Sequence, residues 1–198
     1  MAKRFSMIRE FHFADWFTLA NAISGMGAVL ASMTYLETHD VMHVYLASIA
    51  VFGALVFDVV DGRIARWRQT SSALGRELDS LADVISFGVA PAALAYACGM
   101  QGFYDRVLLA YFVACGVSRL ARYNVTADAL SGGTGKVSYF EGTPIPTSVV
   151  PLSVLLLLFH YGWLRSTSLL GIEFHPVALL FFLSGSLMIS KTVRIPKP

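Results

Sequence analysis

Six long apolar segments divide this sequence and constrain its fold more than any other feature. They occupy residues 16–36, 42–62, 83–104, 107–123, 145–163 and 174–190. A helix needs about 20 apolar residues, within a range of roughly 17–25, to cross the hydrocarbon core of a bilayer. A barrel would instead need long alternating segments, which this sequence lacks. With a mean hydropathy of +0.61, we predict an all-α integral membrane protein with six transmembrane helices, folded as a single domain over residues 1–198.

The N-terminal stretch MAKRFSMIREFHF is basic and aromatic, and it is too charged to enter a bilayer. As a helix it would turn Phe5, Ile8, Phe11 and Phe13 toward lipid and its charged residues toward water, which is typical of an interfacial helix. We therefore predict a short amphipathic helix over residues 1–14 that lies on the membrane surface.

Lysine and arginine are distributed unevenly between the loops. All of them except Arg106 and Arg165 lie before the first segment, between the second and third, at or beyond the end of the fourth, or after the sixth. These positions share one side of the membrane if the segments cross it in turn, and cytoplasmic loops carry the excess of basic residues. Both termini and the charged loop are therefore predicted to face the cytoplasm. A net charge of only +2, spread over several loops, argues against a nucleic-acid partner.

The connection between the second and third segments carries dense charge beside very apolar helices. Its sequence, FDVVDGRIARWRQTSSALGRELDSLADVISFG, contains the pairs Asp58 with Asp61 and Asp79 with Asp83. Spacings of three and four residues put each pair on one helix face. Four converging carboxylates near a bilayer need compensating cations, because an unpaired buried charge is costly. Oxygen ligands favour Mg²⁺, Mn²⁺ or Ca²⁺, and no neighbouring histidine or cysteine suggests zinc. Glu77 does not share the helix face of Asp79 and Asp83, and it is interpreted as a surface charge.

Small residues and an arginine accompany the aspartates. Gly62 and Ala65 follow Asp61, and Gly75 stands one turn before the third aspartate, so a bulky substrate has room to approach the backbone. Arg66 lies about one turn beyond Asp61, where its guanidinium suits a phosphate oxygen. Metal ligands, a guanidinium and small residues together indicate a diphosphate site. The alternative is a solvated helix end in which the acids pair with arginines.

The full pattern, D-x2-D-G-x2-A-R-x8-G-x3-D-x3-D, resembles the signature of the CDP-alcohol phosphotransferases, a family of membrane enzymes. This resemblance implies six transmembrane helices, a homodimer and a cytosol-facing cavity for a CDP-linked lipid. It also implies two divalent metal ions, Mg²⁺ or Mn²⁺, with Ca²⁺ as a non-productive substitute. The implied metal ligands are Asp58, Asp61, Asp79 and Asp83, of which Asp83 is also the expected catalytic base. The implied CDP-lipid site consists of Asp61, Gly62, Ala65, Arg66 and Gly75, with Thr18 and Asn21 added from the similar stretch TLANAISG.

Further stretches resemble one branch of this family, the phosphatidylserine synthases. They are ELDSLADVISFGVAPA, CGVSRLARYNV, YFEGTPIPTS and LMISKTVRIPKP. The sequences of these stretches are most similar to those of fungal members of the branch. The long polar N-terminal extension expected of fungal members does not precede Phe11 here. The resemblance implies that the phosphatidyl group of CDP-diacylglycerol passes to the hydroxyl of L-serine, giving phosphatidylserine and CMP by metal-assisted direct displacement. The expected membrane is the endoplasmic reticulum in a eukaryote or the inner membrane in a prokaryote.

Two arginines at the end of the fourth segment indicate how an amino acid would bind. Arg119 and Arg122 share a helix face in an otherwise apolar stretch, and a guanidinium fork binds a carboxylate well. Tyr123 and Asn124 are expected to add hydrogen bonds. Residues 124–142 are rich in Gly, Ser and Thr and are predicted to form a cytoplasmic loop, from which Lys136 is expected to attract anions. The alternative is that these arginines only anchor the helix on the cytoplasmic side or pair with lipid phosphates.

Other interpretations stay open at the level of sequence. A sister enzyme would use another acceptor: glycerol 3-phosphate, inositol phosphate or choline. A cation transporter would line its route with acids, but the acids gather at one end of the second and third segments, and the first, fifth and sixth carry no internal acid.

Glu141 either meets the serine ammonium or caps its loop. Cys98 and Cys115 lie in apolar runs and are expected in the core.

Overall fold

The computed structural model describes residues 13–68, 73–131, 139–169, 171–192 and 194–196. The helices are α1 (Phe13–Thr38), α2 (Met42–Arg68), α3 (Ala73–Asp83), η2 (Val84–Val89), α4 (Ala90–Ala97), α5 (Phe103–Ser131), η3 (Ile145–Ser148), α6 (Val149–His160) and α7 (Ala178–Ile189). Two antiparallel sheets of two strands pair β1 (Tyr139–Glu141) with β4 (Arg194–Pro196), and β2 (Thr167–Leu169) with β3 (Ile172–Phe174). The interfacial helix predicted over residues 1–14 lies outside the described residues, except for its last two, which belong to α1.

Three helices in the described part of the chain are long and apolar enough to cross a bilayer. They cover Asp15–Thr38, Met42–Ile64 and Leu74–Ala97, and shorter apolar helices cover Ile145–His160 and Ala178–Ile189. The helix α5 is longer than any of these, but it carries several charged residues and is not among the three. The chain is thus a mainly helical integral membrane protein.

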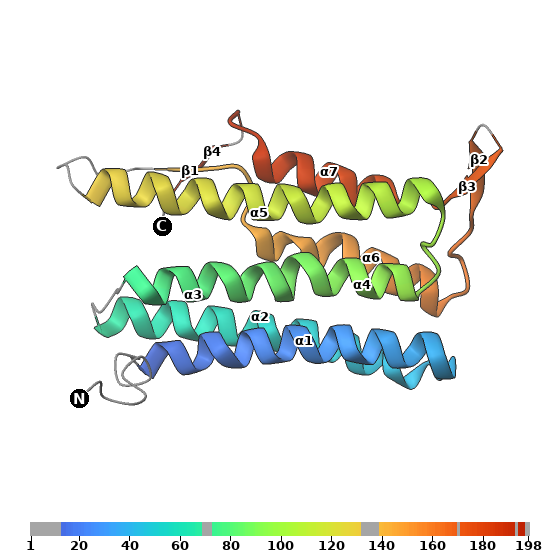
Figure 1. Ribbon diagram of the computed structural model, residues 1–198, viewed down its shortest axis with the longest axis horizontal. Coiled ribbons are helices and arrows are strands. Elements are labelled where there is room, and N and C mark those ends of the chain that lie inside the picture. Colours follow the sequence, from blue (N-terminus) through green and yellow to red (C-terminus); the bar gives the residue numbers. More distant parts are fainter. Residues whose placement is uncertain (1–12, 69–72, 132–138, 170, 193, 197–198) are drawn as a thin grey trace, which may run out of the picture.

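The third predicted segment is shifted in the structure. It was expected over 83–104, whereas the helical rod formed by α3, η2 and α4 begins at Ala73 and ends at Ala97 (Figure 1). The charged stretch was expected to extend this segment at its beginning, and it does so as α3, which is amphipathic with charged residues on one face. The rod ends before Gly99, whose φ of +121° breaks the helical path.

Two other predictions about the elements were wrong. Residues 124–131, expected in a loop, continue α5, and the last helix begins at Ala178 instead of residue 174. Residues 172–174 pair with β2 instead, so the described chain is mainly helical with four short strands. The strands are only three residues long and do not change the helical architecture.

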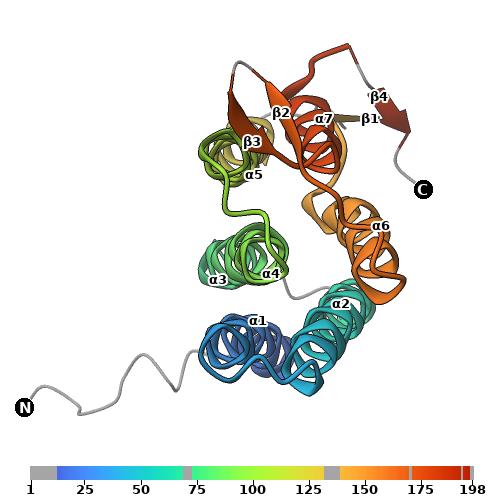
Figure 2. The same ribbon diagram turned by 90° about the vertical axis from the view of Figure 1, so that its right-hand side faces the viewer.

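The long helices run roughly parallel or antiparallel to one another (Figure 1). The start of α1, the end of α2, the start of α3 and the end of α5 lie at one end of the molecule, while β2 and β3 lie at the opposite end. Viewed along the helices, they surround a shared interior (Figure 2). The basic residues of the α2–α3 connection and of the α5 terminus therefore belong to the same end.

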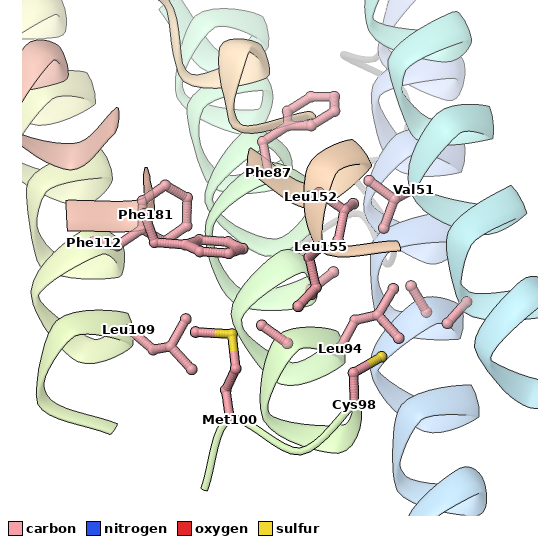
Figure 3. Packing of buried hydrophobic residues seen from close by; sticks show 14 of the residues in the cluster. Val51, Phe87, Leu94, Cys98, Met100, Leu109, Phe112, Leu152, Leu155 and Phe181 are labelled. Carbon is pink, nitrogen blue, oxygen red and sulfur yellow. The ribbon is translucent and has the colours of Figure 1, made fainter. Parts of the chain in front are cut away.

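The core packs side chains from α1, α2, η2, α4, α5, η3, α6 and α7, and Figure 3 shows part of this cluster. Phe112 and Phe181 meet edge to face with ring centroids 5.4 Å apart, and Cys98 and Cys115 are both buried, as predicted. Since lipid tails are as apolar as leucine, helices in a membrane associate through close packing and small residues. At Gly185 of α7, an added Cβ would lie only 3.2 Å from the Cα of Phe112, so this glycine lets α7 approach α5 closely.

The turn after Asp83 is wider than an α-helix. Val84–Val89 forms a π-helix, in which the N–H of Ala90 donates to the carbonyl of Ile85. Pro91 follows directly and has no N–H to donate, so the regular α-helical ladder is interrupted there. Single π-helical turns of this kind are frequent at functional sites.

Candidate active site

Three aspartates converge near one end of the helices. Asp58 and Asp61 lie on the last part of α2, and Asp79 lies on α3, on the other side of the short α2–α3 connection. One carboxylate oxygen from each lies within 4.8 Å of the others. Asp61 is buried and the other two are half-buried. Aspartates from both pairs in the sequence, one pair on α2 and the other at α3, therefore do lie close together in the structure.

The geometry of this group suits a hard divalent cation. Such ions bind oxygen at about 2.0–2.6 Å, so two ligands of one ion lie at most roughly 4–5 Å apart. The three carboxylates meet that limit and offer only oxygen, which is the ligand that Mg²⁺, Mn²⁺ and Ca²⁺ prefer. An acidic group in this arrangement could hold a metal ion, and without one its charges would repel each other.

Asp83 lies outside that group of three and is buried. One of its oxygens accepts a hydrogen bond from Asn21 Nδ2 at 3.3 Å. The charge of Asp79 acts on Asp83 from one side, and the charge of Arg119 interacts with it as well. Asp83 therefore links the acidic group on α2 and α3 to the arginine on α5.

The helix α1 packs against α2, α3 and η2 and supports both acidic positions. Thr18 Oγ1 donates a hydrogen bond to Asp61 Oδ2 at 2.8 Å, and Asn21 holds Asp83. Ser86 of η2 donates its hydroxyl to the backbone carbonyl of Asn21 at 2.9 Å. Thr18 and Asn21, which the resemblance assigned to the CDP-lipid site, thus lie beside the aspartates.

One acid at this site was missed in the sequence. Asp15 is buried one turn before Thr18, and its charge acts on Asp61. The predicted segment began at Trp16, one residue too late, so Asp15 in the first turn of α1 was not counted with the site. An acid within a membrane-spanning helix is itself a functional signal, and it would have found this residue. The sequence contains no comparable signal for Ser86, because its contact with Asn21 depends on how η2 packs against α1.

The remaining positions of the CDP-lipid pattern lie on the same two helices. Gly62 on α2 and Gly75 on α3 are both half-buried. Ala65 and Arg66 belong to α2, but their side chains lie outside the described part of the structure. Glu77 is exposed, as its register predicted.

The two arginines on α5 have different environments. Arg122 Nη1 donates to the carbonyl of Ile189 at the end of α7, at 3.4 Å. Arg119 is half-buried, its Cζ lies 6.0 Å from the centroid of the Tyr123 ring, and its Nε is buried without a hydrogen-bond partner among the described residues. Of the two, Arg119 has the donor that is available to a bound molecule.

The other residues expected to bind an amino acid are placed differently from one another. Tyr123 is 39% exposed. Asn124 exchanges hydrogen bonds with Ser80 of α3, at 3.0 and 3.2 Å, so its amide is already occupied in holding α5 against α3. Lys136 and the side chain of Glu141 lie outside the described part of the chain.

The fold and the site first define a class: a helical integral membrane protein with a partly buried group of aspartates, suited to a divalent cation, at one end of its helices. The sequence then gives the family. A family model described as CDP-alcohol phosphatidyltransferase matches residues 11–184. The chain therefore belongs to the CDP-alcohol phosphatidyltransferase family, which confirms the resemblance of its aspartate pattern.

Curated relatives match nearly the whole chain. A CDP-diacylglycerol–serine O-phosphatidyltransferase of Saccharomyces cerevisiae is 43% identical over 98% of this chain and 74% of its own length. An enzyme of the same name from Helicobacter pylori is 36% identical over 93% of this chain and 71% of its own length. An archaetidylserine synthase of Methanothermobacter thermautotrophicus is 37% identical over 77% of this chain and 60% of its own length.

Proposed function

We propose that this protein is a phosphatidylserine synthase, which transfers the phosphatidyl group of CDP-diacylglycerol to the hydroxyl of L-serine. The products are phosphatidylserine and CMP. The observation that carries the proposal is the similarity over 98% of the chain to a relative named for this reaction. The aspartates of α2 and α3, near which a diphosphate would bind, support it independently.

We assign the nucleotide side of the reaction to the acidic group. Asp58, Asp61, Asp79 and Asp83 would hold two divalent ions, Mg²⁺ or Mn²⁺. Bound ions at this position neutralise diphosphate charge and stabilise the CMP leaving group. Thr18 keeps the Asp61 carboxylate oriented through its hydrogen bond. The rest of the CDP-lipid site is assigned to Asn21, Gly62, Ala65, Arg66 and Gly75.

Asp83 is assigned as the base. The serine hydroxyl is a weak nucleophile at neutral pH, so a positioned carboxylate has to accept its proton as the new bond forms. The serine oxygen attacks the lipid-side phosphorus, the bond from that phosphorus to the CMP oxygen breaks, and the proton passes to Asp83. Asn21 fixes the orientation of the Asp83 carboxylate for this step.

We assign the carboxylate of serine to Arg119. Its Nε has no partner among the described residues, and its charge interacts with that of Asp83, so an amino acid bound there has its hydroxyl near the base. A guanidinium binds a carboxylate through paired donors. Tyr123 beside Arg119 borders this pocket, Arg122 and Asn124 support it through α7 and α3, and Lys136 is assigned to attracting the anionic substrate.

The proposed architecture is a single domain over the whole chain with six transmembrane helices, counting α5, and the protein forms a homodimer.

The proposal also includes an orientation in the membrane. The helix ends that carry the aspartates also carry most of the described basic residues, and such ends face the cytosol. The active site and both termini therefore face the cytosol, where L-serine is available.

Incorporation of radiolabelled serine tests the proposed reaction. Purified protein in mixed micelles with CDP-diacylglycerol and Mn²⁺ is expected to label phosphatidylserine and to release an equal amount of CMP. Parallel reactions replace serine with glycerol 3-phosphate, inositol phosphate or choline. Preferential use of one of these would assign the chain to a sister activity, and metal flux into liposomes without nucleotide would point to a transporter.

A further inference from the structure

Four buried polar side-chain atoms in the described part of the chain have no hydrogen-bond partner. They are Asn21 Oδ1, Arg119 Nε, Thr143 Oγ1 and Ser148 Oγ. Most buried polar atoms in native proteins are paired, so each exception requires an explanation, and a bound ligand is one. Asn21 and Arg119 already flank Asp83. Ser148 comes from another part of the chain and has no role in the assignments above.

The direction of the Ser148 side chain follows from the geometry of η3. This element is a 3₁₀-helix, in which side chains three residues apart eclipse each other. Ser148 therefore shares a face with Ile145. Ile145 packs closely on Gly116 of α5, where an added Cβ would lie 2.8 Å from Ile145 Cδ1, and it also reaches Gly88 of η2, at 4.0 Å from such a Cβ. This face of η3 is thus turned toward α5 and η2.

The same interface contains the assigned acceptor site. On α5, Arg119 lies three residues beyond Gly116 and so shares its face. Asp83 directly precedes η2, and Gly88 follows it by about one π-helical turn. Since η3 contacts both η2 and α5, the fully buried Ser148 lies on the face of η3 that is turned toward the two parts of the chain carrying Asp83 and Arg119.

An amino acid with a hydroxyl side chain needs three different partners there. Arg119 supplies donors for the carboxylate and Asp83 takes the hydroxyl proton, so the ammonium needs acceptors of its own. The unpaired oxygens Asn21 Oδ1 and Ser148 Oγ are both of this kind. A serine hydroxyl oxygen can accept a hydrogen bond from N–H. We propose that Ser148 Oγ accepts a hydrogen bond from the ammonium group of the acceptor substrate and helps to select an amino acid. This inference rests on the proposed function.

The substitution Ser148→Ala removes this hydroxyl with little change in volume. The KM for serine is expected to rise roughly 10- to 100-fold, the range for a hydrogen bond to a charged group, while the KM for CDP-diacylglycerol and the thermal stability stay unchanged. The matched control is Ser153→Ala on α6, since Ser153 Oγ donates to the carbonyl of Val149 in its own helix, at 2.7 Å. The control is expected to keep the wild-type KM for serine.

Two serine analogues identify the group that is bound. Inhibition by ethanolamine, which keeps the ammonium and the hydroxyl, should weaken in Ser148→Ala, whereas inhibition by 3-hydroxypropionate, which keeps the carboxylate and the hydroxyl, should not. Weakening of 3-hydroxypropionate alone would assign Ser148 to the carboxylate, and equal weakening of both would assign it to the shared hydroxyl; either result would overturn the inference. An active wild-type enzyme with an unchanged KM for serine in Ser148→Ala would overturn this inference alone. A wild-type protein that releases no CMP with serine would overturn the proposed function.

Discussion

The two arginines in the second half of α5 lie one turn apart and yet are held in different ways. Arg122 is bound to the carbonyl of Ile189, while Arg119 has a buried Nε without a partner among the described residues and interacts with Asp83. A buried donor that is left unpaired in the free protein is best explained by a ligand that pairs with it. At the residue scale, two side chains that look equivalent in the sequence therefore have different roles.

Replacing each arginine by lysine tests this distinction. Arg119→Lys keeps the charge but loses the planar fork, so the KM for serine should rise by roughly 10-fold or more, with a smaller change in the KM for CDP-diacylglycerol. Arg122→Lys serves as the matched control and should change the KM for serine by less. Steady-state CMP release with each substrate varied in turn measures both values. A larger effect at Arg122 would exchange the two assignments.

Residue patterns predicted part of the site for a physical reason. Asp58, Asp61 and Asp79 could be found because spacings of three and four residues fix a common helix face, whatever the rest of the fold is. Ser148 could not be found, because its direction depends on how η3 docks between α5 and η2. The same applies to Ser86, which lies beside Asn21 only because α1 and η2 pack closely.

The close packing of α1 and η2 depends on one glycine. A Cβ added to Gly25 would lie 2.7 Å from the Cα of Ser86, a backbone atom that cannot move aside alone. Across this contact Ser86 donates to the carbonyl of Asn21, and Asn21 in turn holds Asp83. At the scale of the elements, the position of the catalytic carboxylate therefore depends on the distance between α1 and η2.

The substitution Gly25→Ala should force these two elements apart. We expect a loss of thermal stability in detergent and a fall of at least about 10-fold in kcat, since an error of 1 Å in placing reacting groups can cost 100-fold. The neighbouring Gly27→Ala is the control, because nothing lies within 4 Å of a Cβ at Gly27. Equal behaviour of the two variants would show that the α1–η2 contact does not position the site.

The boundaries of elements were harder to predict than their existence. The first two apolar segments correspond to α1 and α2, since hydropathy alone marks long apolar helices. The end of α4 and the start of α7 were misplaced because apolar residues continue past both, into the Gly99 turn and from the β3 strand. Hydropathy does not distinguish a helix from the turn or strand that follows it.

The end of the molecule opposite the aspartates has its own buried acid. Asp105 is fully buried in the first turn of α5 and accepts hydrogen bonds from the backbone N–H of His175 at 2.8 Å and of Gly102 at 3.2 Å. Its other contact is with His175 Nδ1, at 2.8 Å. These bonds tie the β2–β3 hairpin and the start of α7 to α5. On the scale of the whole molecule, this cluster stabilises the fold at a distance from the reaction.

Removing this acid should affect stability and leave catalysis intact. Asp105→Ala leaves two buried backbone donors unpaired, so the free energy of unfolding should fall by roughly 2–4 kcal/mol. The KM values of the folded fraction should stay at the wild-type level. Thermal unfolding in detergent and CMP release measure the two effects. Glu173→Gln, at an exposed side chain of β3, is the control. A changed KM for serine with unchanged stability would contradict this separation.

The central claim is that the aspartates of α2 and α3 bind a divalent ion required for CMP release. CMP release by Asp79→Asn, measured with and without EDTA and with Mn²⁺ or Mg²⁺ added back, tests it most directly. Chelation should stop the wild-type reaction, added metal should restore it, and Asp79→Asn should lose at least about 100-fold in kcat. Glu77→Gln, an exposed acid on the same helix, should behave as wild type. Near-wild-type turnover by Asp79→Asn, or a wild-type enzyme indifferent to EDTA, would contradict the account.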